Sequence, residues 1–351
     1  MATAINYKCP NCAAALAFEI STQKWDCHFC NSSFNKDELS RISSQKGESR
    51  IEEAGWQAEA FDKNNMIAFT CPSCGGRVIA EKNTAATFCV YCHNPTVLAA
   101  QLQGEYRPAR IIPFKKTKTE AVAALQNHCK GPFMPKVFKE YARRGEMTGL
   151  YVPYWLFSAV ARAGLTGRGE KVSSWSDSDY RYTKTDSYRI ERQVSVPFNL
   201  VPADASERLD DKLMEDMEPF AYSQLTDFSM EYLSGHFAES YDVDAAKSSR
   251  RFEQRIDKTV TEILKGSVHG FTSYNYSLTN RDLARRTTLY VMLPVWIIMV
   301  KYNGIIHTFA MNGQSGKISG RLPFSWKRVF AWFGTLAGAF SLLFLLGGLF
   351  L

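Results

Sequence analysis

Eight cysteines lie in a spacing pattern that occurs twice in the first 100 residues. Each copy reads C-x2-C, an interval of 14 residues and a second C-x2-C, and the second copy begins 62 residues after the first. The two sets are Cys9, Cys12, Cys27 and Cys30, followed by Cys71, Cys74, Cys89 and Cys92. A C-x2-C turn directs both sulfurs at one ion, and two such turns supply the four thiolates of a tetrahedral Zn2+ site. The pattern predicts two bound zinc ions.

Disulfides and redox pairs are the alternatives to zinc. Disulfides persist in oxidising compartments, and the first ten residues do not resemble a signal peptide. A thioredoxin-like pair belongs to a βαβ unit and does not occur as paired turns. A four-cysteine site leaves no open position for water or substrate, so we expect both zinc ions to be structural.

His28 and His93 each adjoin a cysteine and are expected on the surface, and Cys129 is expected to be a thiol within a helix.

Composition and periodicity divide the chain into six segments. These are a first zinc ribbon (1–34), a polar linker (35–65), a second zinc ribbon (66–100), a basic helical segment (101–148), an α+β domain (149–323) and a transmembrane anchor (329–351). The interval between the paired cysteines suits a β-hairpin that returns to the metal. The helical segment starts with a capping-box pattern at Thr117–Glu120 and is interrupted at Gly131–Pro132.

The α+β domain is predicted from its apolar runs and turns. Strands are expected at 150–160 and 289–300, and residues 180–201 alternate like a hairpin. Turn sequences at 303–304 and 312–316 predict a final meander. Helices are expected where apolar residues recur at helical spacing, at Leu209, Leu213 and Met217, and at Phe252, Ile256, Val260, Ile263 and Leu264. We therefore expect an α+β fold with an antiparallel sheet covered on one side by helices.

Two strands of this domain share an apolar-Pro-x-Trp pattern. Pro153 and Trp155 form the first copy, and Pro294 and Trp296 form the second. Proline removes a ladder hydrogen bond and belongs at an edge or a bulge, so the pair is expected to frame a cleft or two sheet edges. The alternative is two bulged core strands with buried tryptophans.

The C-terminal segment is strongly apolar. Residues 329–351 contain 23 residues without a charge. As a helix they extend about 34 Å, enough for a hydrocarbon core of about 30 Å. Lys327 and Arg328 precede the segment, which predicts a single-pass, tail-anchored protein of the cell membrane with most of the chain on the cytoplasmic side. Gly334 and Gly338 match the G-x-x-x-G spacing of paired helices, one route to a homo-oligomer.

The distribution of charge argues against nucleic acid as the partner. The formal net charge is +7, yet residues 1–100 carry 9 basic and 10 acidic residues. Ribbons that bind phosphates should be basic. Residues 101–160 hold 10 basic and 4 acidic residues. The basic cluster consists of Lys115, Lys116, Lys118, Lys136, Lys139, Arg143 and Arg144. It is expected to contact a membrane surface or a partner, and a solvated helix face is the alternative.

An enzyme is a further alternative, for which the chain carries little support. It has no H-E-x-x-H, G-x-S-x-G or G-x-G-x-x-G sequence. The segment Gly313–Lys317 differs from a Walker A loop, because only two residues separate its glycines. His236, His269 and His307 are scattered, although distant residues can converge in a fold.

Several segments together resemble a known family. They are the duplicated ribbons, Gly149–Phe157, Lys212–Phe220, Tyr232–Gly235, Leu293–Trp296 and Met311–Lys317. The chain resembles the bacterial proteins catalogued as TFIIB-type zinc ribbon-containing. The resemblance implies protein partners of the SPFH (flotillin-like) or phage-shock-protein-A-like kind, and a role in envelope stress. We therefore predict a membrane-anchored adaptor that recruits proteins through its ribbons, with a nucleic-acid-binding ribbon protein as the first alternative and an enzyme as the second.

Overall fold

The chain forms two compact units. A computed structural model describes residues 4–5, 7–45, 60–61, 66–75, 77–103, 106–131, 133–323 and 325–348. The first unit comprises Met1–Val152, Arg208–Ser240 and Met292–Leu351, and the second comprises Pro153–Glu207 and Tyr241–Val291. Most of the predicted polar linker, at 46–59 and 62–65, lies outside the described residues.

The first ribbon is a small three-stranded sheet in the first unit. Its antiparallel strands are β2 (Ala17–Glu19), β3 (Lys24–Asp26) and β4 (Ser33–Phe34), and helix α1 (Lys36–Gln45) follows. The hairpin of β2 and β3 occupies the interval between the two cysteine pairs, which confirms the prediction for this copy. Trp25 of β3 is buried against the rings of Phe18 and Tyr232, at 5.1 and 5.2 Å between centroids.

The second ribbon contributes to two sheets. Strands β5 (Ala60–Phe61), β6 (Met66–Thr70) and β7 (Arg77–Glu81) form a sheet of their own. Strands β8 (Thr84–Phe88) and β9 (Pro95–Leu98) belong to the large sheet, where β1 (Ala4–Ile5) pairs with β9, and the turn η1 (Ala99–Leu102) follows. Phe69, Val78 and Leu98 pack with two of the cysteines in one buried cluster.

The rest of the first unit holds short strands and most of the helices. The strands are β10 (Arg110–Ile111), β13 (Thr226–Asp227), β14 (Phe237–Glu239), β16 (Ile305–Asn312) and β17 (Ile318–Gly320). The helices and helical turns are α2 (Lys118–His128), α3 (Lys136–Arg144), α4 (Asp211–Asp216), η3 (Tyr222–Gln224), η4 (Met230–Leu233) and α6 (Trp326–Gly348).

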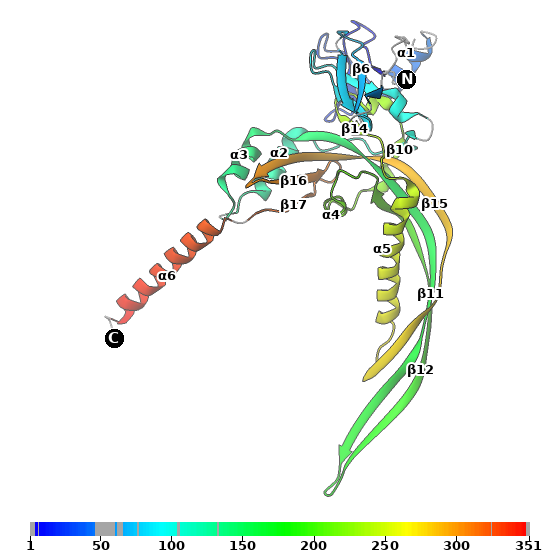
Figure 1. Cartoon of the computed structure of the whole chain (residues 1–351), viewed down its shortest axis with the longest axis vertical. Helices are drawn as coiled ribbons and strands as arrows, with labels where there is room; N and C mark the ends of the chain where they lie inside the picture. The colour runs from blue at the N-terminus through cyan, green and yellow to red at the C-terminus, as the bar shows by residue number, and fades with distance from the viewer. Residues whose placement is uncertain are drawn as a thin grey trace. The chain divides into compact units, whose positions relative to one another are not determined.

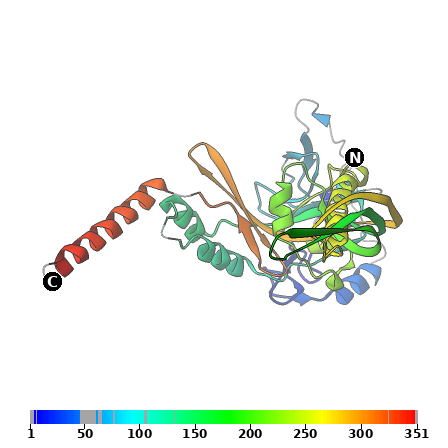
Figure 2. The same ribbon diagram turned by 90° about the horizontal axis from the view of Figure 1, so that it is seen from below.

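Two local predictions for this region are confirmed. Thr117 caps α2, and its side chain and that of Glu120 form the expected capping box. Asn303 and Gly304, both with positive φ, form the tight turn that leads into β16. Helices α2 and α3 lie side by side in both views (Figure 1, Figure 2).

The second unit contains one helix, one whole long strand and most of two others, whose remaining residues, 148–152 and 292–302, belong to the first unit. These elements are β11 (Thr148–Ser176), β12 (Arg181–Asp204), α5 (Ala245–Gly266) and β15 (Ser273–Tyr302). Figure 1 shows α5 lying along the β11–β12 ladder. Phe252, Ile256, Val260 and Leu264 of α5 are buried there as predicted, whereas Ile263 is exposed.

One strand prediction is wrong in this unit. Residues 180–201 do not form a hairpin but lie within the single strand β12, which pairs antiparallel with β11 from Ser176↔Arg181 to Tyr154↔Asp204. The turn stands at Asp177–Tyr180, where the Asp177 carboxylate accepts hydrogen bonds from two backbone N–H groups.

The large sheet is mostly antiparallel. Its strand order is β1-β9-β8-β14-β11-β15-β10-β13, with β12 beside β11, β16 beside β15 and β17 beside β16. The pair β11–β14 is parallel. This sheet, its helices and the two cysteine clusters support the α+β class with two N-terminal ribbons.

The predicted transmembrane anchor at 329–351 is wrong, and with it the predicted single-pass location in the cell membrane. Within the described ranges, no helix combines the length and the apolar character needed to cross a membrane. Helix α6 begins at Trp326, so its first turn takes in Lys327 and Arg328, and its sequence includes four glycines and two hydroxyl residues. Residues 349–351 lie outside the described part of the chain.

Candidate metal centres and the adjoining cleft

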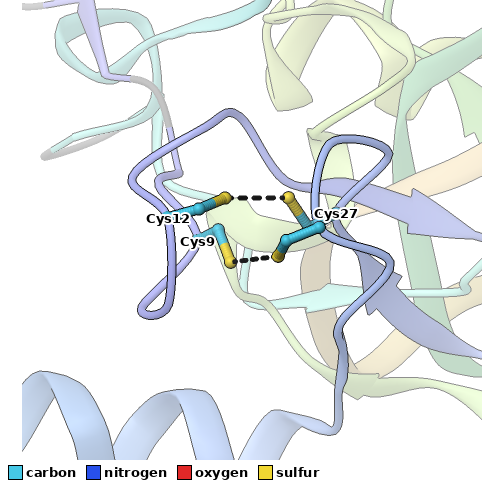
Figure 3. A group of neighbouring side chains, drawn as sticks. Cys9, Cys12 and Cys27 are labelled. Atoms are coloured by element: carbon cyan, nitrogen blue, oxygen red, sulfur yellow. Dashed lines mark hydrogen bonds between the residues drawn. The ribbon is translucent and has the colours of Figure 1, made fainter.

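The first cysteine cluster joins two turns of the first ribbon. The sulfur atoms of Cys9 and Cys30 are 3.6 Å apart, and those of Cys12 and Cys27 are 3.5 Å apart. All four sulfurs lie within 4.8 Å of one another. Figure 3 shows the cysteine side chains converging from the two turns. Thiolates bound tetrahedrally at about 2.3 Å from an ion are about 3.8 Å apart, so the spacing fits one metal ion.

The second cluster repeats this geometry. The sulfur atoms of Cys71 and Cys92 are 3.7 Å apart, and those of Cys74 and Cys89 are also 3.7 Å apart. These four sulfurs again lie within 4.8 Å of one another. The chain therefore has two groups of four cysteines that could each hold a metal ion.

All four C-x2-C turns share one backbone conformation. The residue after each turn's second cysteine has a positive φ: 62° at Ala13, 56° at Asn31, 73° at Gly75 and 56° at His93. The N–H of that residue donates to the carbonyl of the turn's first cysteine, at 2.8 to 2.9 Å. The left-handed residue closes the turn and holds the two sulfurs on one side. His93 thus has a backbone role, and both it and His28 are exposed, as expected for surface residues.

Neighbouring groups shift the pKa values of the thiols in opposite directions. The Ser32 hydroxyl, 3.2 Å from Cys30 Sγ, lowers the pKa of that thiol to about 6. Burial raises the pKa of Cys89, but the N–H groups of Cys92 and Tyr91 outweigh it and lower the pKa to about 7. Burial and the adjacent sulfurs raise the pKa of Cys92 to about 12. Four thiolates this close together repel one another, so a cation is needed to stabilise them together.

One segment of the core holds the first ribbon. We call residues 231–240 the strap. The Trp25 indole N–H donates to the Glu231 carbonyl at 2.9 Å, and the Ser234 hydroxyl donates to the Leu16 carbonyl at 2.5 Å. Tertiary hydrogen bonds thus fix this ribbon in addition to its own hairpin.

The same strap holds the second ribbon. Ala238 of β14 pairs with Ala86 of β8. The Ser240 N–H donates to the Asn83 carbonyl at 2.8 Å. Both ribbons are therefore attached to one stretch of about ten residues within the first unit.

A cleft of about 670 Å³ lies between the ribbons and the core of the first unit. This volume is in the range of ligand pockets, about 300–1,000 Å³. Residues that line it come from both ribbons and from the core, and include Ala15, Glu19, Phe29, Phe88, His93, Lys118, His236 and Trp296.

His236 of the strap is the most buried polar residue that lines the cleft, at 6% exposed. Its ring stacks on Phe114 at 4.5 Å between centroids and meets the edges of Tyr151 and Trp296. Gly149 makes room for it, because a Cβ there would lie 2.9 Å from the imidazole. Among the described residues, His236 Nδ1 has no hydrogen-bond partner.

The surroundings of His236 keep its ring neutral. Burial lowers the pKa of His236 to about 4, although the nearby Glu19 carboxylate opposes the change. At neutral pH the imidazole is uncharged and offers one donor and one acceptor.

The first Pro-x-Trp pair lies in the second unit. Pro153 is buried, and Trp155 packs against the rings of Tyr241 and Tyr290, both at 5.1 Å. The Trp155 indole N–H donates to the Val243 carbonyl at 2.9 Å. This pair forms part of the packing of its own unit.

The second Pro-x-Trp pair lies in the first unit. Pro294 is buried, and its carbonyl accepts from the Gly313 N–H at 2.8 Å. The Trp296 indole N–H donates to the Lys116 carbonyl at 2.8 Å. Trp296 also lines the cleft beside His236.

The basic cluster extends from the start of α2 to the end of α3. Lys115, Lys118, Lys136, Arg143 and Arg144 are exposed, and Lys116 and Lys139 are partly buried. Lys116 pairs with Glu120 at 2.8 Å and lowers the pKa of that carboxyl group to about 2. Lys118 alone of these residues lines the cleft.

Sequence reasoning named Trp296 as a possible cleft residue, but it missed His236 and the position of the cleft between the ribbons. The histidine had no partner at metal-site spacing, and its neighbours come from positions more than 50 residues away. The only local signal was the adjoining Tyr232–Gly235, one of the segments that carry the family resemblance.

Comparison with known proteins gives one informative relative. The uncharacterized protein YdjG of Bacillus subtilis (strain 168) is 32% identical over 335 residues, which cover 95% of this chain and 94% of the relative. No protein-family model and no solved structure matches the chain.

Proposed function

We propose that this chain, which belongs to the same family as the Bacillus subtilis protein YdjG, is a zinc-folded scaffold that binds a protein partner through its two ribbons. In this proposal each cysteine cluster holds one structural Zn2+. Four sulfur donors in a tetrahedral spacing favour zinc, and no ligand position remains for catalysis at the metal.

The observation that carries the proposal is an exposed aromatic residue at the same position of both ribbons. Phe29 lies two residues after Cys27 and is 80% exposed, and Tyr91 lies two residues after Cys89 and is 66% exposed. Val90 beside Tyr91 is 65% exposed. Exposed aromatic residues on a rigid turn are typical anchors of protein interfaces, where phenylalanine and tyrosine are enriched.

The charge of the ribbons supports a protein partner over nucleic acid. The first 100 residues carry 9 basic and 10 acidic residues, so they offer no net attraction to phosphates. SPFH-like and phage-shock-protein-A-like proteins, the partner classes implied by the family resemblance, are the first candidates.

A binding experiment with matched variants tests the proposal. The full chain is immobilised with zinc, and the SPFH-like and phage-shock-protein-A-like proteins of the same organism are applied as soluble analytes. The double variant Phe29→Ser, Tyr91→Ser should weaken binding by about 30-fold, as expected for the loss of a hot spot worth about 2 kcal/mol.

The control is Tyr180→Ser, which removes a side chain of similar exposure, 68%, from the other unit. It should bind like the wild type, and all three proteins should retain two zinc ions. Equal affinity of the double variant and the wild type would contradict the proposal, as would binding of single-stranded DNA at high salt with no affinity for either protein.

A further inference from the structure

The fixed charges that line the cleft between the ribbons cancel. Among the lining residues that the structure describes, Glu19 is the one carboxylate and Lys118 is the one lysine or arginine. The Ser21 N–H donates to the Glu19 carboxylate at 3.1 Å and lowers its pKa, so the carboxylate is ionised. One negative and one positive group give no net attraction to a phosphate or to a strongly acidic or basic chain.

The deep side of the cleft is aromatic with a single neutral polar ring. Trp296 and His236, both buried, line the cleft, and the ring of Phe114 stacks on the histidine. A charged ligand group beside this uncharged imidazole would be desolvated without compensation. A neutral amide or hydroxyl group can exchange a hydrogen bond with the imidazole at no such cost.

The outer side of the cleft continues onto the ribbon surface. Phe29 lines the cleft and is also 80% exposed, and Phe88 of the second ribbon lines the cleft as well. An occupant can therefore contact the deep aromatic residues and the exposed turn together. This continuity favours an extended chain over a small metabolite.

We infer that the cleft binds an uncharged peptide segment of the partner protein, which inserts an aromatic or apolar side chain beside Trp296 and hydrogen-bonds to His236. The inference rests on the proposed function and names the part of the partner that is recognised. Backbone amides supply the neutral hydrogen-bonding groups, and the walls of both ribbons contact the peptide.

Selection from a phage-displayed library of random short peptides tests the inference. The bait is the full zinc-loaded chain. Enriched peptides should contain an aromatic residue and have a net charge near zero. Enrichment of strongly acidic or basic peptides, or no enrichment over an empty surface, would overturn the inference.

Two variants place the selected peptides in the cleft. Ala15→Trp fills the space between the ribbons, and His236→Phe keeps the aromatic packing but removes the hydrogen bond. Each should weaken peptide binding by about tenfold or more. Ala246→Trp, on an exposed position of α5 in the other unit, is the matched control and should bind like the wild type.

The same variants separate this inference from the proposed function. If Ala15→Trp and His236→Phe retain two zinc ions and the wild-type affinity for both peptides and partner, the inference is wrong. If the partner is then still lost on replacing Phe29 and Tyr91, the scaffold function stands without the cleft. Competition of the peptides by single-stranded DNA would assign the cleft to nucleic acid and overturn the inference.

Discussion

The conformation of single residues determines how well each cysteine pair is arranged for a metal. The residue after every C-x2-C turn has a positive φ and donates to the first cysteine's carbonyl. Glycine adopts this conformation freely, whereas an alanine pays about 1 kcal/mol or more. Gly75 and Ala13 occupy equivalent positions in the two ribbons, so the ribbons provide a reciprocal test.

Two single variants, Ala13→Gly and Gly75→Ala, should shift the free energy of unfolding in opposite directions. Ala13→Gly should raise the free energy of unfolding of the first ribbon by about 0.5–1 kcal/mol, after allowance for the greater entropy of the unfolded chain. Gly75→Ala should lower the free energy of unfolding of the second ribbon by about 1 kcal/mol, because alanine is strained at a positive φ. Steric overlap adds nothing to this cost, since a Cβ at Gly75 would meet no atom within 4 Å. Thermal unfolding at saturating zinc measures both, and a shift of the same sign in both variants would refute the equivalence.

His236 should make the protein acid-sensitive. Its folded-state pKa of about 4 lies below the ordinary value of 6.5, so the unfolded chain takes up the proton first as the pH falls. The stability of the folded state is therefore lost progressively from about pH 6.5 towards pH 4. Between pH 7 and pH 5 the loss from this residue amounts to about 2 kcal/mol.

The variant His236→Phe isolates this contribution. Both proteins release zinc in acid, so the informative quantity is the difference between them at each pH, measured by urea unfolding with the zinc content monitored. The wild type should lose about 2 kcal/mol more than the variant between pH 7 and pH 5. Parallel pH profiles would show that His236 is already protonated or solvated in the folded protein.

Some functional residues could be predicted from the sequence and others could not. The ligand cysteines were predictable because each pair is local and the spacing itself encodes the geometry. His236 was not predictable, because its burial depends on Phe114, Tyr151 and Trp296, which lie far from it along the chain.

Among the elements, the hairpin of β11 and β12 stands out by its length and exposure. From Lys171 to Arg189 the described side chains are exposed or nearly so, whereas Leu165 and Ile190 belong to the core beside α5. The outer part of the hairpin therefore adds little to the stability of its unit. Isolated two-stranded ladders are marginally stable in water.

Shortening this hairpin should leave the fold intact. Residues 173–184 are replaced by Asn-Gly, which joins the paired residues Val172 and Thr185 through a two-residue turn. The free energy of unfolding should change by no more than about 0.5 kcal/mol, because surface residues are removed. Leu165→Ala, at a fully buried position, is the contrasting control and should cost about 2–5 kcal/mol. A loss of more than about 2 kcal/mol on shortening would show that the outer hairpin is part of the core.

Element lengths were harder to predict than element types. The apolar stripe of α5 and the capping box of α2 were legible, since both depend on residues within a few turns. The strands extend far beyond their apolar runs because a neighbouring strand continues the ladder through polar residues. The turn at Asp177–Tyr180 was missed for the same reason, and β12 was mistaken for a hairpin.

At the scale of the molecule, the two ribbons are parts of the first unit and not separate appendages. The strap at 231–240 bonds to the first ribbon through Ser234 and to the second through Ala238 and Ser240. These contacts join residues more than 150 positions apart, which local sequence patterns do not reveal. The C-terminal run was predicted to be a membrane anchor from its lack of charge, and no helix of the described residues is long and apolar enough for that.

Metal analysis of the purified full chain tests most directly whether the two ribbons are folded around metal ions. We predict two zinc ions per chain in the wild type. Cys30→Ser and Cys74→Ser should each retain one zinc ion, because each removes one ligand from a different cluster of four. A wild-type chain that contains no zinc, or that loses both ions when a single cluster is altered, would contradict two independent structural zinc sites.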